Sequence, residues 1–589
     1  MRVSEYLVKK LEELGITDIF GVAGDYNFNI LDAVEKNPQI HWIGCTNELN
    51  AGYAADGYAR LKGYGALLTT YGAGELSAVN AVAGSFAENV SVINIVGMPE
   101  SKHLEAKTIL HHSFGNPNPE ACKNIYENIT EALSILSEEN SKTEIDRVLK
   151  AFVKYRRPVY IGIPSDIAQK EIADECIDYE WKSDRNILED AAGKIIEKIK
   201  NSENPVILGD ILVKRYDALI EFREFAEKSG LPVTNFAMGT NLINFDYEKY
   251  LGTYFGDFEN KEAKKAAETT DCLIAVGPVY SDVNSFGFRL PYDINSQIAI
   301  YGTYTYIDGV KYDNIKMSEL LEALSGRIEH REVEVTNPIP LYGKAETAKK
   351  KISSKYIFSR LQEFLGENNI FIAETGTVLH GAFSMKFVQS VEVLTQPLWA
   401  SIGWATAAAL GAGIAKQGAK VVLLTGDGAH LISAIEVGNM LRYGIKPVII
   451  VVNNGGYTLE RLISEKPDAE FNNIADLNYA RFARSFNGDI WATKVETSDD
   501  FDKALRVTQI MNKLCYIEVC TDRMDTSELT GKVFNNNYAP PEEEGLQEPP
   551  NTGGQMLFAN RDIKFETTVH ESLRLEDEED INEENGQNG

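Results

Sequence analysis

The chain has 589 residues, of which 44% are hydrophobic and 25% charged, a composition typical of folded proteins with several cores. Its formal net charge of -29 at pH 7 argues against a nucleic-acid partner, because nucleic acids are bound by clustered Lys and Arg. The six scattered cysteines form no C-x-x-C pair, so they indicate neither a disulfide framework nor a cysteine zinc site, and a reducing, cytoplasmic setting is expected.

The chain opens on an amphipathic segment, residues 1–15, whose apolar positions recur at helical spacing. This segment lacks the apolar core of a signal peptide, and no later run approaches the roughly 18 apolar residues that a membrane span needs, so no membrane partner is expected. Strand-like runs then alternate with helical patterns, which predicts a doubly wound α/β layer. The strand-like runs are 19–22, 65–70, 90–96 and 157–164, and the helical segments are 50–61 and 76–87.

Two further α/β blocks follow a charged stretch, 169–185, that we interpret as a linker. The fold class is therefore predicted as α/β, with three doubly wound parallel-sheet domains at 1–180, 186–340 and 350–534. Residues 535–589 are rich in Asn, Pro, Gly and Glu and cannot bury enough apolar area to offset their ordering entropy, so a mostly disordered acidic tail is expected. The later strand-like runs begin at 205, 272, 369, 421, 447 and 516.

A strand that runs into Gly-Asp-Gly, followed by a strand that ends in Asn-Asn, carries the strongest chemical signal. Asp427 and Asn454 should meet at the carboxyl edge of a parallel sheet, where open α/β folds bind ligands, and Gly456 can add a backbone carbonyl. Three such oxygen ligands suit Mg²⁺, which usually shares its shell with phosphates, while glycine N–H groups are left to cradle a diphosphate. For the glycine motif alone, a tight structural turn is the alternative interpretation.

Further motifs, spread over about residues 1–530, match the same known family as this pattern. The motifs are GVAGDYNFNILD around Asp25, TNELNAGYAADGYAR around Glu48, TYGAGELSAVN from Thr70, LHHSFGN with His111 and His112, IAETGT from Ile372, and LWASIG around Ile402. Together they resemble the thiamine diphosphate-dependent 2-oxo acid decarboxylases, in the branch of the pyruvate and indolepyruvate decarboxylases. The resemblance implies thiamine diphosphate and Mg²⁺ as cofactors and non-oxidative decarboxylation of a 2-oxo acid to an aldehyde and CO₂.

The resemblance also assigns roles at the cofactor. Thiamine chemistry requires removal of the thiazolium C2 proton, which a carboxylate bound to the aminopyrimidine nitrogen promotes, and Glu48 resembles that carboxylate. Ile402 would wedge between the two cofactor rings, and the carbonyl of Ala400, where the family often has Gly, would accept from the amino group. The remaining cofactor-binding positions implied by the resemblance are Thr70, Thr375, Gly426, Asp427, Gly428, Asn454 and Gly456.

Proton transfer after loss of CO₂ requires donors and acceptors from the protein, and Asp25, His111, His112 and Glu460 match the family positions that supply them. Taken singly, each of these four residues reads equally well as a polar loop, turn or helix residue. Together they distinguish the decarboxylases from thiamine-dependent carboligases and oxidases, which generally lack the histidine pair.

The positions that match the family's substrate pocket are apolar, which suits an aliphatic or aromatic side chain. Val283 stands where pyruvate-selective members tend to carry an aromatic ring, so the sequence hints at a substrate bulkier than pyruvate. The pocket residues are Val283, Leu379, Leu459 and Ile463.

By resemblance, the active site lies between the first domain of one subunit and the third domain of another, so Glu48 and Asp427 would serve one cofactor from different chains. A homodimer is then the minimum active unit, and a homotetramer is common in the family. Two alternatives stay open. A carboligase of the acetolactate synthase type is disfavoured by His111, His112 and Glu460, and a catalytically silent regulatory homologue is disfavoured because the matched positions are intact.

Overall fold

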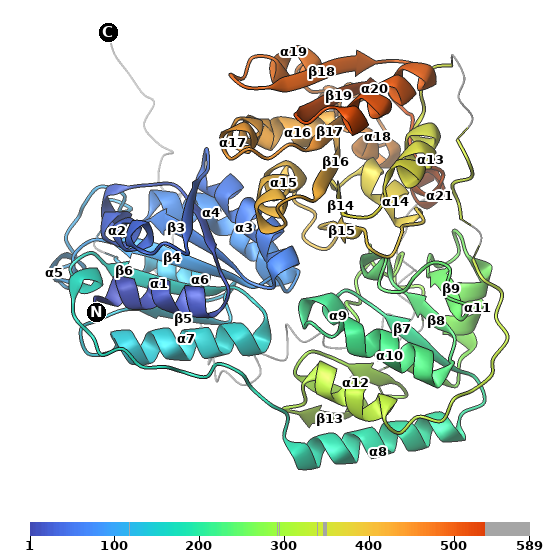
Figure 1. Ribbon diagram of the computed structural model, residues 1–589, viewed down its shortest axis with the longest axis horizontal. Helices are drawn as coiled ribbons and strands as arrows, with labels where there is room; N and C mark the ends of the chain where they lie inside the picture. The colour runs from blue at the N-terminus through green and yellow to red at the C-terminus, as the bar shows by residue number, and fades with distance from the viewer. Residues whose placement is uncertain (117, 291–292, 294, 339, 346–349, 536–589) are drawn as a thin grey trace, which may run out of the picture. The chain divides into compact units, whose positions relative to one another are not determined.

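The computed structural model describes residues 1–535 except 117, 291–292, 294, 339 and 346–349, and the acidic tail expected beyond this point lies outside the described residues. The described residues form three sheets with helices packed against them (Figure 1), which confirms the α/β fold class. All six cysteines lie in the described part and are free. No helix in that part is long and apolar enough to cross a membrane.

The first sheet is parallel throughout, with the strand order β2-β1-β3-β4-β6-β5. Its central strands are buried along their whole length, as expected of near-continuous apolar runs such as GALLTT and VINIVGM. The strands are β1 (Asp18–Gly21), β2 (His41–Gly44), β3 (Gly65–Thr70), β4 (Val92–Met98), β5 (Ala132–Ile135) and β6 (Val159–Pro164). The helices are α1 (Val3–Glu13), η1 (Asp25–Asn27), α2 (Phe28–Lys36), α3 (Glu48–Lys62), α4 (Ala73–Ala87), α5 (Ser101–Glu105), α6 (Ala121–Tyr126), α7 (Ser141–Tyr155) and η2 (Ile167–Gln169).

The second sheet has the order β13-β12-β11-β10-β7-β8-β9 and is parallel except at one edge, where β12 and β13 pair antiparallel. This hairpin is a difference from the purely parallel sheet that the sequence predicts, and its two-residue turn at Asp308 and Gly309 has positive φ at both positions. The strands are β7 (Pro205–Gly209), β8 (Val233–Asn235), β9 (Tyr250–Thr253), β10 (Cys272–Val276), β11 (Ile298–Ile300), β12 (Tyr304–Ile307) and β13 (Val310–Asp313). The helices are α8 (Arg185–Asn201), α9 (Leu212–Arg215), α10 (Leu219–Ser229), η3 (Ala237–Gly239), α11 (Lys261–Thr269) and α12 (Met317–Ser325).

The third sheet is again parallel, with the order β15-β14-β16-β17-β19-β18, so the carboxyl ends of its strands share one edge. The strands are β14 (Asn369–Ala373), β15 (Glu392–Leu394), β16 (Lys420–Gly426), β17 (Val448–Asn453), β18 (Ile490–Val495) and β19 (Leu514–Cys520). The helices are α13 (Ser354–Phe364), α14 (Thr377–Phe383), α15 (Trp404–Ala415), α16 (Asp427–Ser433), η4 (Ala434–Glu436), α17 (Val437–Arg442), α18 (Thr458–Ile463), η5 (Glu470–Asn472), α19 (Tyr479–Ala483), α20 (Ser498–Ile510) and α21 (Glu528–Asn535).

Helices α3 and α15 join the first and third sheets by packing closely against each other (Figure 1). A Cβ atom added to Gly411 would lie 1.8 Å from the carbonyl oxygen of Ala54, and one added to Gly57 would lie 2.4 Å from that of Ala408. One buried apolar cluster runs through this contact and contains side chains of both sheets. The close approach of the two helices therefore requires glycine at both positions.

We predict that Gly411→Ala destabilises the folded chain by about 1–3 kcal/mol, because the added methyl group meets the Ala54 carbonyl and a packed core tolerates extra volume poorly. Gly193 in α8 is the matched control, since a Cβ there has no atom within 4 Å, and Gly193→Ala should gain about 1 kcal/mol of helix propensity. Urea unfolding of the two variants measures the difference. Equal stability of the two proteins would contradict the backbone contact.

Candidate active site

Asp427 and Asn454 lie at the carboxyl ends of adjacent parallel strands, where the strand pattern of the sequence predicts them. β16 ends at Gly426 and pairs with β17, which ends at Asn453. Asp427 is the first residue of α16 and is only 2% exposed. The hydroxyl of Tyr479 donates to the Asp427 carbonyl at 3.2 Å, which ties the start of α16 to α19.

Backbone N–H groups surround the Asp427 carboxylate. Oδ2 accepts from Asn454 at 3.1 Å, Gly455 at 2.7 Å and Gly456 at 3.2 Å, and Oδ1 accepts from Gly428 at 2.8 Å. These four N–H groups therefore bind Asp427, and the cradle for a diphosphate expected from the glycines and the helix N-terminus stays a prediction. A buried carboxylate needs donors of its own, and even with four of them burial raises the pKa of Asp427.

Oxygen atoms beside this carboxylate remain available as ligands. The side-chain oxygen Oδ1 of Asn454 is buried and accepts no hydrogen bond. Gly456 has a φ of 137°, and a Cβ there would lie 2.2 Å from the carbonyl oxygen of Asn472, so this turn excludes every other residue. One carboxylate and one unpaired amide oxygen at a sheet edge fit an oxygen-ligated cation.

Ala400 and Ile402 lie in the loop that precedes α15. Ala400 has a φ of 54°, a left-handed conformation that costs a non-glycine residue about 1–2 kcal/mol. Gln396 holds this turn, because its carbonyl accepts from the Ala400 N–H at 3.2 Å and its Oε1 accepts from the Ser401 N–H at 3.2 Å. The half-buried Ile402 side chain lies two residues after the strained Ala400, with Ser401 between them.

Glu374, which the sequence analysis missed, anchors the same loop from the third sheet. Its fully buried carboxylate accepts from the N–H groups of Gly403 and Ala405, both at 3.2 Å, and from Thr375 at 3.0 Å. Burial raises the pKa of Glu374 to about 8 despite these donors. The Thr375 hydroxyl in turn donates to the Gln396 carbonyl at 3.1 Å, so one network holds Thr375 and the loop that carries Ile402.

A buried ion network ties this loop to α3 and α4. Arg60 Nε lies 2.6 Å from Asp56 Oδ1 and its Nη1 lies 3.2 Å from Glu88 Oε2, with all three side chains fully buried. Glu88 also accepts the Leu398 N–H at 2.8 Å, and the Trp404 indole donates to Asp56 at 2.8 Å. The available sequence signal was an Asp-Arg pair four residues apart in a helix made mostly of small residues.

Glu48 begins α3, which is capped by the Asn47 side chain accepting the Asn50 N–H at 2.8 Å. Its Oε1 lies 3.2 Å from the place where Gly74 would carry a Cβ, and the Thr70 methyl group lies 2.9 Å from the same place. The Thr70 hydroxyl is buried without a partner. Glu48, Thr70 and Gly74 therefore form a second polar group, at the carboxyl edge of the first sheet.

Asp25, His111 and His112 lie close together near the carboxyl edge of the first sheet. His111 Nε2 lies 2.8 Å from Asp25 Oδ2, and the Tyr26 ring stacks on the His111 ring with centroids 4.8 Å apart. The His112 ring packs edge-on against His111 at 4.9 Å. The side chains of His111 and Asp25 stay 56% and 51% exposed, so the pair is accessible to a ligand. Tyr26 is a further residue that the sequence analysis missed.

The residues expected to line a substrate pocket are spread over three segments. Val283 is half-buried in the loop after β10, and Leu379 in α14 is buried. Leu459 is half-buried and Ile463 is 57% exposed in α18, beside an exposed Glu460. Leu379 thus belongs to the packing between the second and third sheets, whereas α18 presents accessible side chains. The buried partners of Leu379 are Ala237, Phe255, Phe286, Phe383, Leu529 and Val533.

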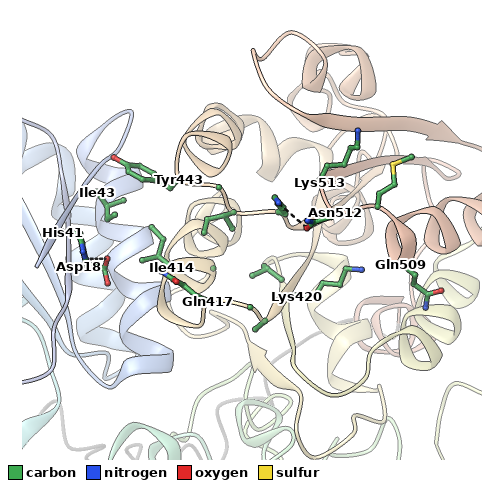
Figure 2. A pocket seen from close by; sticks show the side chains of 18 of the residues that line it. Asp18, His41, Ile43, Ile414, Gln417, Lys420, Tyr443, Gln509, Asn512 and Lys513 are labelled. Carbon is green, nitrogen blue, oxygen red and sulfur yellow. Dashed lines mark hydrogen bonds and ion pairs between the residues drawn. The ribbon is translucent and has the colours of Figure 1, made fainter. Parts of the chain in front are cut away.

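In the described part of the chain, no hydrogen bond or ion pair joins the Glu48 group to the Asp427 group. A hollow of about 900 Å³ does lie between the first and third sheets, but at the amino ends of their strands. Figure 2 shows its walls, with Asp18 and His41 on one side and Lys420 and Lys513 on the other. Because these residues begin or precede strands, the hollow is separate from the edges that carry the candidate site.

Comparison with known proteins gives three family matches. Residues 1–120 match the thiamine pyrophosphate enzyme N-terminal TPP binding domain, residues 192–313 the central domain and residues 375–519 the C-terminal TPP binding domain. The two polar groups described above fall in the first and last of these matches. Together, the fold and the matches define a thiamine pyrophosphate enzyme.

Relatives narrow this class. The chain is 32% identical to pyruvate decarboxylase isozyme 2 of Saccharomyces cerevisiae over 517 residues, which cover 85% of this chain and 92% of the relative. It is 34% identical to the alpha-keto-acid decarboxylase of Mycobacterium leprae over 540 residues, which cover 90% and 94% of the two chains. The protein therefore belongs to the thiamine diphosphate-dependent 2-oxo acid decarboxylase family.

We predict that Ala400→Gly leaves the protein at least as stable as the parent, whereas Ala400→Val destabilises it by about 1–3 kcal/mol. Glycine adopts the observed φ of 54° without strain, and a β-branched side chain is an outlier there. Thermal unfolding of the two variants, measured side by side, checks this. A valine variant that melts with the parent would show that the loop does not hold the left-handed turn.

We also predict that Gly72→Ala lowers the catalytic rate at least tenfold, because a Cβ there would lie 1.9 Å from the His112 carbonyl oxygen and displace the histidine loop. Gly115 on the same loop is the matched control, since its φ is also positive but no atom lies within 4 Å of an added Cβ. Steady-state rates of both variants separate displacement from backbone strain. Equal losses in the two variants would refute the role of the Gly72 contact.

Proposed function

We propose that this protein decarboxylates a small 2-oxo acid to an aldehyde and CO₂ without oxidation. The observation that carries this proposal is the hydrogen-bonded pair of His111 and Asp25, 2.8 Å apart and half exposed, with His112 beside it. A histidine hydrogen-bonded to a carboxylate can act as a general acid or base, which aldehyde release requires. Membership of the decarboxylase family supports the same reaction.

Thiamine diphosphate, when bound, supplies the carbon nucleophile and the electron sink that make loss of CO₂ possible. The protein's part is to orient the cofactor and move protons. Glu48 is half-buried at the start of α3 beside Gly74, so its carboxylate can hold a proton at the ring nitrogen of a pyrimidine seated there. Ile402 is held in place by the anchored Ala400 turn and can act as the wedge that bends the cofactor.

A Mg²⁺ ion at Asp427, Asn454 and Gly456 is the second part of the proposal. In the described residues no three His, Cys, Asp or Glu side chains come together as metal ligands. A cation would therefore rely on the Asp427 carboxylate, the unpaired Asn454 Oδ1 and a backbone carbonyl, the oxygen set that Mg²⁺ prefers when phosphates complete its shell. Gly426 and Gly428 flank the carboxylate; a Cβ at Gly426 would have no atom within 4 Å, whereas one at Gly428 would lie 2.6 Å from the Tyr457 ring.

We further propose that the active unit is a homodimer or homotetramer in the cytoplasm. Self-association is supported by large apolar side chains that are exposed on segments close in sequence to the two polar groups, because burying apolar surface favours association. Free cysteines support a reducing compartment. The exposed apolar residues are Phe28, Phe114, Trp399, Ile432 and Ile435, at 40–55% exposure.

We predict that Glu48→Gln abolishes turnover but leaves cofactor bound, because it removes a proton relay and no metal ligand. Asp427→Ala should lose Mg²⁺-dependent cofactor binding instead. Activity of Glu48→Gln within about tenfold of the parent, a barrier change below about 1.4 kcal/mol, would overturn the assignment. Calorimetric titration with thiamine diphosphate and Mg²⁺ separates the two defects.

Mixing the two inactive variants tests whether one cofactor is shared between chains. If the cofactor is shared, each mixed dimer has one intact site of two. After random exchange of subunits, half of the dimers are mixed, so about one quarter of the parent activity should return. No recovery after verified exchange would place both residues at a cofactor within one chain.

The substrate is tested by aldehyde release, coupled to NADH oxidation by alcohol dehydrogenase, with pyruvate, 4-methyl-2-oxopentanoate, phenylpyruvate and indolepyruvate. We expect a bulky substrate to be preferred, and Val283→Phe to shift preference toward pyruvate by filling the pocket. No turnover of any of the four by protein with bound cofactor would contradict the decarboxylase proposal.

A further inference from the structure

Arg461 in α18 is a buried cation next to the exposed Glu460. It is only 1% exposed, and in the described part of the chain its guanidinium has no carboxylate within ion-pair distance. Burying a charge without a counter-ion costs free energy unless hydrogen bonds compensate for it. The oxygen atoms that accept hydrogen bonds from Arg461 therefore indicate its structural role.

The guanidinium donates mainly to backbone carbonyls, which belong to three separate segments. Nη2 lies 2.6 Å from the Gly455 carbonyl oxygen and 3.2 Å from that of Asn472. Nη1 lies 3.4 Å from the Asn454 carbonyl oxygen and, at the limit of hydrogen bonding, 3.5 Å from that of Arg523. A planar fork with several fixed donors can bridge such a set, and a lysine ammonium cannot.

In the loop after β17, the backbone carbonyls and the backbone N–H groups bind different partners. The carbonyls of Asn454 and Gly455 face Arg461, while the N–H groups of Asn454, Gly455 and Gly456 face the Asp427 carboxylate. The Asn454 side-chain oxygen is then a buried polar atom of this turn that has no hydrogen-bond partner. A Cβ on Gly456 would lie 2.5 Å from Arg461 Nη2, so the tight turn and the buried guanidinium depend on each other.

We propose that Arg461 is a positioning residue, which fixes the Asn454–Gly456 turn so that Asn454 Oδ1 faces the cation site at Asp427. Because Arg461 directly follows Glu460 in α18, it also sets the register of Glu460 relative to that site. The proposal rests on the Mg²⁺ site of the proposed function. A guanidinium that only stabilised the fold would leave cation affinity unchanged.

The deciding variant is Arg461→Lys, which keeps the charge and the stem but loses the fork, and Arg461→Gln removes the charge as well. Arg523→Gln is the matched control, because Arg523 is an exposed arginine of the same region that bonds Asn473 and Asp468. Calorimetric binding of thiamine diphosphate across a Mg²⁺ titration, without substrate, gives the half-saturating Mg²⁺ concentration of each protein. Melting of each protein without cofactor measures stability separately.

We expect half-saturation to rise at least tenfold in Arg461→Lys and further in Arg461→Gln, and to stay within about twofold in Arg523→Gln. A half-saturation within threefold of the parent in Arg461→Lys would overturn the positioning role, as would a rise matched by Arg523→Gln. If the parent itself binds thiamine diphosphate without any dependence on Mg²⁺ or Asp427, the metal proposal fails, and that result is distinct from failure at Arg461 alone.

Discussion

The backbone contact between α3 and α15 is the constraint on which the rest of the site depends. Gly57 and Gly411 carry no side chains, so each helix meets a carbonyl oxygen of the other and one apolar core runs through both sheets. That approach buries Arg60, Asp56 and Glu88 together and thereby holds the loop before α15. A larger separation would break the hydrogen bonds that Asp56 accepts from the Trp404 indole and Glu88 from the Leu398 N–H, and a hydrogen bond to a charged group contributes about 1.5–3 kcal/mol.

Buried titratable groups recur at loops that hold an unusual shape. Asp427 gathers N–H groups from the turn after β17, Glu374 gathers those at the start of α15, and Glu75 binds the Gly72 N–H beneath the histidine loop at 2.8 Å. Burial raises the pKa of each, to about 7 for Glu75 and about 8 for Glu374. Arg461 has the complementary role, because its guanidinium donates hydrogen bonds to backbone carbonyls. Burying each group costs desolvation free energy, and the hydrogen bonds that it makes hold the backbone of the loop in place.

The polar groups with chemical roles divide between two sheet edges. The first sheet carries Glu48 and the Asp25–His111 pair, which we propose for proton transfer, and the third carries Asp427 and Asn454, whose oxygens we propose as cation ligands. Parallel sheets produce this arrangement because strand carboxyl ends share one edge, so loops distant in sequence converge there. A cofactor with a ring at one end and a diphosphate at the other suits two such edges, which agrees with the family of this chain.

The sequence by itself determined the α/β class, the course of the central strands and the placement of Asp427 and Asn454 at one sheet edge, because these follow from local apolar runs and from the shared edge of parallel strands. The site roles of these residues, and of Asp25 and His111, stay predictions. The tertiary structure alone decided which donors serve which carboxylate. The N–H groups of the turn after β17 bind Asp427, and Glu374 and Arg60 bind groups far from them in the chain. Such pairings depend on burial and on the meeting of distant segments, which no periodicity or motif encodes.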